Sequence, residues 1–194
     1  MHTIIGNRFL AAVFAALVIG AGAPAQAAEY DLDIEGMHAF VEFKVPHLTY
    51  SVLSGRFNEF DGSFTWDREN PGDSSISVTI QTASLDSNHE ERDQHLISEE
   101  FLNVAKHPTA TFVSTSYDGD ASGGTLSGNL TLNGVTRAIE LAVSAIGEGK
   151  DPWGGYRAGF TATTTLRGPQ FGYSHPFFPK EIEMAFGIEG VLRE

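Results

Sequence analysis

Residues 126–145 read LSGNLTLNGVTRAIELAVSA, and this stretch decides the fold class. Apolar residues alternate with polar ones on both sides of Asn133-Gly134. Alternation with a period of two places successive side chains on opposite faces of a β-strand. Asn-Gly between two such runs is a strong hairpin signal, because both residues adopt positive φ readily. The stretch therefore predicts two antiparallel strands joined by a tight turn.

The same alternation recurs along most of the chain. Each further run has one apolar and one polar face, and glycine-rich segments separate several of them. Together the runs predict about eight antiparallel strands whose apolar faces meet inside a closed barrel or a sandwich. Charged and hydroxyl side chains then face water. The further runs lie at residues 39–45, 60–66, 75–81, 110–112, 158–166 and 182–188.

One segment departs from the alternation. Ser87 and Glu90 have the spacing of a capping box, in which each side chain hydrogen-bonds the backbone of the other residue. The spacing predicts a short helix over residues 90–97, followed by a second turn over residues 98–103. The predicted fold class is therefore all-β, a barrel with a short helical insertion.

Composition excludes several classes of function. Twelve Lys and Arg residues against 25 Asp and Glu give a formal net charge of −13, whereas nucleic-acid binding needs clustered positive charge. The absence of Cys excludes disulfides, thiolate metal sites and thiol nucleophiles. No segment after residue 27 approaches the roughly 18 apolar residues of a membrane-spanning helix. We therefore expect neither a nucleic-acid-binding protein nor an integral membrane protein.

The first 27 residues have the three parts of a secretory signal peptide. Arg8 lies in a positive amino-terminal region, residues 9–19 are uniformly apolar, and Ala25-Gln26-Ala27 is a small-x-small cleavage site. We expect residues 1–27 to be removed and residues 28–194 to form one mature domain. A chain exported in this way without cysteines is expected in the periplasm.

The chain contains no recognisable catalytic motif. Phosphate-binding glycine loops and G-x-S-x-G are absent. Residues 89–93 begin like the zinc motif H-E-x-x-H but have Asp where the second His belongs. The histidines show no ligand spacing, so no metal site and no catalytic residue is predicted. This absence of catalytic motifs favours a binding protein over an enzyme.

Seven groups of residues together resemble the YceI family of bacterial periplasmic proteins. They keep the family's order and spacing over essentially the whole mature chain. The segment at residues 168–180 departs from the family pattern, because His175-Pro176-Phe177-Phe178-Pro179 is more aromatic, and its role stays open. The matching groups are residues 36–43, 55–62, 88–96, 101–103, 107–116, 128–136 and 151–160.

The resemblance implies a lipocalin-like antiparallel barrel around a long apolar pore. The implied ligand is a non-covalently bound polyisoprenoid lipid, such as a quinone tail or a polyprenyl phosphate. The implied function is a periplasmic carrier or binding protein without catalysis and without a covalent cofactor. The oligomeric state stays open, a homodimer included.

The residues alone are compatible with either a packed core or a lipid-filled tunnel, because apolar inner faces suit both. The small inward residues Gly128, Ala145, Ala158 and Ala162 favour a tunnel. We then expect the pore to be lined by inward-facing residues of the alternating runs. These are Val41, Phe43, Phe64, Ile76, Val78, Ile80, Phe112, Leu130, Leu141, Phe160, Met184 and Phe186.

A second hypothesis is a hydrolase or other enzyme that acts on a lipid headgroup at the barrel mouth. His89, Arg92 and His95 of the helical segment would then approach the headgroup. Under the binding hypothesis the same three side chains are candidates for the rim of the pore mouth.

The signal-peptide hypothesis predicts the mass of the exported chain. Intact-mass measurement of the periplasmic fraction should show a chain that begins within about two residues of Ala28, because signal peptidase cleaves after small-x-small. A retained Met1 would contradict the prediction.

Overall fold

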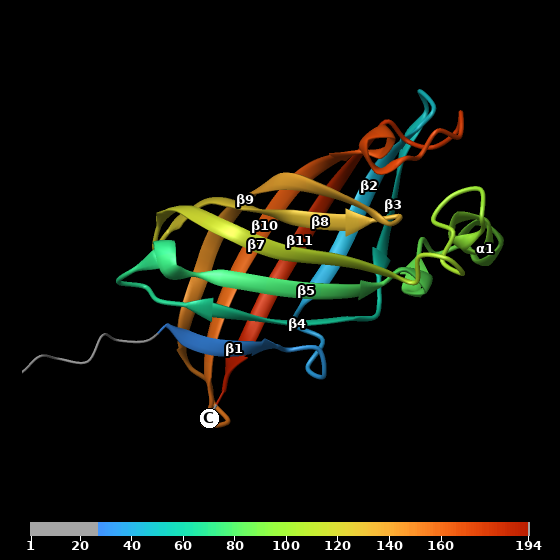
Figure 1. The fold of residues 1–194 in the computed structure, drawn as a ribbon. Helices are drawn as coiled ribbons and strands as arrows, with labels where there is room; N and C mark the ends of the chain where they lie inside the picture. Colours follow the sequence, from blue (N-terminus) through green and yellow to red (C-terminus); the bar gives the residue numbers. More distant parts are fainter. Residues whose placement is uncertain (1–26, 194) are drawn as a thin grey trace, which may run out of the picture.

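Eight antiparallel strands close into a barrel in the computed structural model, which describes residues 27–193 (Figure 1). Pairing of the first ring strand with the last closes the barrel and confirms the predicted fold class. Residues 1–26 of the predicted signal peptide lie outside the described residues. In spatial order the ring consists of β1 (Ala28–Leu32), β4 (Phe60–Trp66), β5 (Ser75–Gln81), β7 (Thr109–Asp120), β8 (Gly123–Leu132), β9 (Val135–Lys150), β10 (Tyr156–Arg167) and β11 (Glu181–Leu192).

Strand β11 pairs with two strands in succession along one edge. Residues 190–192 pair with β1, whereas residues 183–187 pair with β2 (Phe40–His47). Strand β2 continues to β3 (Ser51–Phe57), which pairs with the two-residue strand β6 (Leu85–Asp86). The β2–β3 hairpin therefore extends the wall, and its tip projects from one end of the barrel (Figure 1).

The predicted turn at Asn133-Gly134 is a two-residue hairpin between β8 and β9. Asn133 has φ 53° and Gly134 has φ 70°, the left-handed backbone that matches the twist of two paired strands. Thr131 and Thr136 share a side-chain hydrogen bond of 2.8 Å beside the turn. The local sequence therefore sets the register of these strands.

Helix α1 (Glu90–Ile97) has the bounds that the sequence predicted, but the predicted capping box is wrong. Asn88 has a left-handed φ of 64°, and the chain enters the helix at His89, whose Nδ1 accepts a hydrogen bond from the Arg92 amide at 3.2 Å. The Ser87 hydroxyl instead donates to Asp93. Among the described residues no helix has the length and apolar character needed to span a membrane. Three short 3₁₀ helices are η1 (Pro71–Asp73), η2 (Thr82–Ser84) and η3 (Gly168–Phe171).

An ion-pair network on the outside of the barrel ties β10 to the closing strands. Arg157 Nη1 donates to Glu189 Oε1 of β11 at 2.7 Å and also to the carboxylate of Asp33, which directly follows β1. Arg157 Nε donates to Asp151 Oδ2 in the β9–β10 turn at 2.8 Å. Since Asp33 is only 9% exposed, the guanidinium compensates a charge that water cannot reach well.

The same network lowers the pKa of Asp33. Burial raises this pKa, but hydrogen bonds from His38, Arg157 and the Gly36 amide outweigh it and bring the value from 3.8 to about 2. Asp33, His38 and Glu189 also form a group of three potential metal ligands among the described residues. The Arg157 guanidinium lies within this group, so its positive charge opposes a bound cation.

Replacing Arg157 by Ala should lower the free energy of unfolding by about 3 kcal/mol at neutral pH, because buried Asp33 loses its guanidinium partner. Since the pKa of Asp33 is lowered in the folded state, its stabilisation is present above about pH 4 and lost as the pH falls towards 2. Urea unfolding at pH 7 and pH 3 should therefore show the variant's deficit shrinking in acid.

Arg193→Ala is the control, because Arg193 likewise pairs with carboxylates, two against the three of Arg157, but is more exposed to solvent. Solvent and salt screen such a pair. Arg193→Ala should therefore lower the free energy of unfolding much less than Arg157→Ala does. Equal losses in the two variants would contradict the assigned role of Arg157.

Candidate ligand-binding cavity

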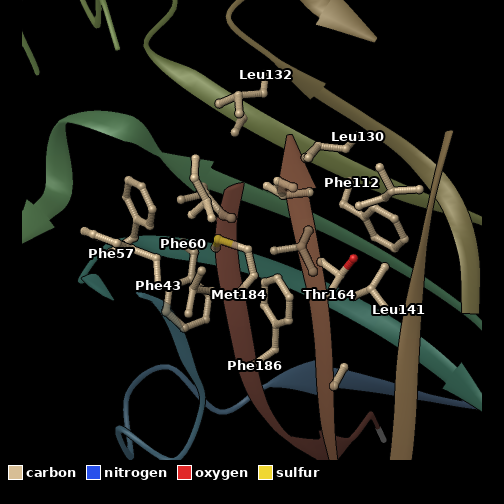
Figure 2. Close-up of a pocket in the computed structure, with 18 of the residues that line it drawn as sticks. Phe43, Phe57, Phe60, Phe112, Leu130, Leu132, Leu141, Thr164, Met184 and Phe186 are labelled. Carbon is tan, nitrogen blue, oxygen red and sulfur yellow. The ribbon is translucent and has the colours of Figure 1, made fainter. Parts of the chain in front are cut away.

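The barrel encloses a cavity of about 1140 Å³, which is larger than most small-molecule sites of about 300–1,000 Å³. Apolar side chains from the facing walls point into it, as Figure 2 shows for Phe60, Leu132, Leu141 and Met184. The interior is therefore hollow rather than a packed core.

All twelve side chains that the sequence predicted for the pore lining face this cavity. The reason is the two-residue period, since the same register directs Glu140 and Glu183 outward to solvent. The structure thus places these side chains around the cavity. That they contact a bound ligand remains a prediction. The twelve are Val41, Phe43, Phe64, Ile76, Val78, Ile80, Phe112, Leu130, Leu141, Phe160, Met184 and Phe186.

Aromatic rings lie over glycines of other strands, Phe112 of β7 over the adjacent β8 and Phe64 of β4 over β11, which lies beyond β1. A Cβ atom added at Gly128 would stand 2.3 Å from the Phe112 ring, and one at Gly190 would stand 2.4 Å from the Phe64 ring. The missing side chains let both rings lie along the wall. The predicted room above Gly128 is therefore taken by Phe112, and of the three small alanines only Ala162 lines the cavity.

Aromatic side chains cluster at one end of the cavity. The rings of Trp66 and Phe160 meet edge to face with centroids 4.9 Å apart, and Tyr117 also packs edge to face on Trp66 at 6.5 Å. The indole Nε1 of Trp66 donates to Glu148 at 2.6 Å, which satisfies the polar atom of this otherwise apolar group. We call Trp66, Tyr117 and Phe160 the floor.

The opposite end is the mouth, where three segments meet around the cavity. They are the β2–β3 tip, the α1 segment and residues 176–180, all gathered at the same end of the barrel (Figure 1). Phe178 stacks on Tyr173 with centroids 4.0 Å apart and on Phe101 at 5.9 Å. The aromatic segment whose role the sequence left open therefore forms part of the mouth.

Two of the three predicted mouth residues line the cavity, and His89 does not. His89 caps α1 instead. Arg92 donates from Nε to the Ser87 hydroxyl at 2.7 Å, and His95 Nε2 lies 2.8 Å from Glu100. Each of the three side chains thus has a hydrogen-bond partner within its own segment, and they do not converge on one point of the cavity.

Sequence analysis missed part of the lining. Phe60, Phe57 and Thr164 face the cavity (Figure 2), and the alternation around Phe60 and Thr164 could have identified both. Phe101 and Phe177 come from irregular segments, where no period fixes the direction of a side chain.

Charge is scarce around the cavity. Within residues 27–193, Arg92, Lys180 and Glu181 are the only Lys, Arg, Asp or Glu side chains in the lining, and all three are at the mouth. Such a site can bury a long apolar chain without desolvating charges, and it can keep a polar end group at the mouth.

Comparisons with known proteins agree on one family. The model of the YceI-like domain matches residues 30–190. A UPF0312 protein of Pseudomonas aeruginosa is 49% identical over 187 residues, or 95% of this chain and 98% of that protein. The Campylobacter jejuni YceI crystal structure is similar with a TM-score of 0.69 and 26% identity, over 78% of this chain and 91% of that chain. A polyisoprenoid binding domain from Saccharophagus degradans, 15% identical, shares the fold with a TM-score of 0.63, over 87% and 100% of the two chains.

Gly128→Ala should destabilise the barrel by about 1–3 kcal/mol, because the new methyl group overlaps the Phe112 ring and the Val113 carbonyl. Gly147→Ala in β9 is the matched control, since a Cβ there meets no atom within 4 Å. Urea denaturation of both variants measures the difference. Equal stability of the two would contradict the close packing of Phe112 on Gly128.

Proposed function

Because the chain belongs to the YceI-like domain family, we propose that its barrel binds one long-chain isoprenoid lipid non-covalently as a periplasmic carrier protein. The observation that carries the proposal is the hollow, apolar interior of about 1140 Å³. The polyisoprenoid binding domain of S. degradans has the same fold and supports the choice of ligand class. A quinone and a polyprenyl phosphate are the two proposed examples.

The energetics of the cavity suit a tail better than a headgroup. Burial of each methylene contributes about 0.8 kcal/mol of transfer free energy, so a long tail needs few polar contacts. Ordering the flexible tail offsets much of this gain. We therefore expect selection by tail length and branching, with the floor residues Trp66, Tyr117 and Phe160 limiting how far the tail can enter.

The headgroup is proposed to stay at the mouth. Arg92 and Lys180 carry positive charge there, beside Glu181. A phosphate would find two cations close by, and a quinone ring would find the aromatic surface of Phe101 and Phe178. The site thus accommodates either end group, while the tail supplies most of the affinity.

The proposal includes no covalent chemistry. General acid–base or nucleophilic catalysis needs groups within hydrogen-bond reach of one reacting atom, whereas His89, Arg92 and His95 are each engaged within the α1 segment. A defined turnover of a lipid headgroup that is lost in His95→Ala would favour the enzyme hypothesis instead.

Organic extraction and mass spectrometry of protein produced in its native host test the proposal. Wild type should yield a long-chain isoprenoid. Leu130→Trp should remain folded, with a melting temperature close to that of wild type, because the cavity has room for the larger ring. It should bind no such lipid or only one with a shorter tail.

Val113→Trp is the matched control, because Val113 lies on β7 beside Leu130's strand but is half exposed on the outer face. It should carry the same lipid as wild type. A wild-type extract without any long-chain lipid would contradict the proposed function and leave the barrel unaffected.

A further inference from the structure

Apolar side chains project into solvent from both loops at the mouth. Tyr50 is 82% exposed and Val52 is 65% exposed at the β2–β3 tip, and Phe177 is 78% exposed in the neighbouring loop. The two loops project from the same end of the barrel (Figure 1). Contiguous exposed apolar surface of this kind marks an interaction site. We call Leu48, Tyr50, Val52 and Phe177 the apolar tips.

The apolar tips are continuous with the cavity. Leu48 and Phe177 line the cavity and are also 66% and 78% exposed to solvent. Leu48 has a left-handed φ of 54°, an unfavourable backbone for a bulky residue. Leu48 lies in the β2–β3 turn, where the Tyr50 amide donates to the His47 carbonyl at 3.2 Å, and this turn presents the leucine side chain at the edge of the cavity.

Both loops lack acidic side chains. The chain has 25 Asp and Glu residues, yet residues 44–57 and residues 168–180 contain none. Transfer of these loops from water to an apolar environment therefore desolvates no carboxylate of their own. Helix α1, with Glu90, Glu91 and Asp93, lies at the same end of the barrel (Figure 1), so these carboxylates have to stay in water when the loops leave it.

We infer that the apolar tips dock the mouth onto the surface of a lipid bilayer. This inference rests on the proposed function, since docking lets a lipid tail pass between bilayer and cavity along an unbroken apolar surface. Tyr50 suits the headgroup level, where the hydroxyl stays wet while the ring is buried. The chain's net charge of −13 makes attraction to anionic lipids unfavourable, so insertion of apolar side chains drives the contact.

Sedimentation with phosphatidylcholine vesicles tests the inference on the mature protein. Wild type should partition onto the vesicles at both low and high salt, because the contact is apolar. Tyr50→Asp and Val52→Asp should each lower the partition coefficient about tenfold or more. Neither residue lines the cavity, so the lipid that co-purifies with the protein should be unchanged.

Ile146→Asp is the matched control. Ile146 is 73% exposed. It follows Ala145, whose amide donates a hydrogen bond to the carbonyl of Ser122 in the β7–β8 turn. This turn lies at the floor end of the barrel. This variant adds the same charge away from the mouth and should bind vesicles like wild type. Melting temperatures of all three variants confirm that they are folded.

Two outcomes would overturn the inference. The first is lipid-loaded wild type that does not bind vesicles, a result that leaves the proposed function intact. The second is a dimer in light scattering that Tyr50→Asp dissociates while vesicle binding is unchanged, because the tips would then contact a second copy. A third outcome separates the two hypotheses. If wild type binds vesicles but its extract holds no long-chain lipid, the proposed function is contradicted and the docking inference is not.

Discussion

Closure of the sheet is the constraint on which the rest of the structure depends. Strand β1 completes the ring by pairing with residues 190–192 of β11, and closure gives every ring strand two neighbours, so that no free edge is left in the ring. Arg157 stabilises this junction from outside by joining β10, β11 and the residue after β1. Hydrogen bonds and side-chain contacts between neighbouring strands stabilise the barrel wall. The barrel therefore does not need a fully packed interior.

A hollow interior loses the dispersion energy that a packed core would supply. The protein limits this loss by packing rings over glycines, Phe112 against Gly128 and Phe64 against Gly190. Side chains from opposite walls meet at the floor end, where Phe160 contacts Phe64 and Trp66. A lipid tail would restore the missing contacts across the cavity. Stability and ligand binding are then linked, because a ligand that binds only the folded state also stabilises it.

The two ends of the barrel differ in construction, and this difference gives the cavity a direction. At the floor, the rings of Trp66, Tyr117 and Phe160 pack together, and the Trp66 indole donates to Glu148. At the mouth, the rim consists of the β2–β3 tip, the α1 segment and residues 176–180, and Arg92, Lys180 and Glu181 carry the charges of the lining there. Under the proposed function a lipid enters the cavity with its apolar tail first, and its polar end remains near Arg92 and Lys180.

The sequence by itself determined the features that depend on local backbone geometry. A period of two assigned all twelve predicted lining residues to the inner face, Asn133-Gly134 fixed a hairpin, and the breaks in alternation located helix α1. Only the tertiary structure decided whether the interior is hollow, where the rings lie, and which loops form the mouth. Asp33 and Arg157 are 124 positions apart, and Phe112 covers Gly128 on another strand. Such contacts depend on how the closed ring brings distant strands and loops together, which no local pattern encodes.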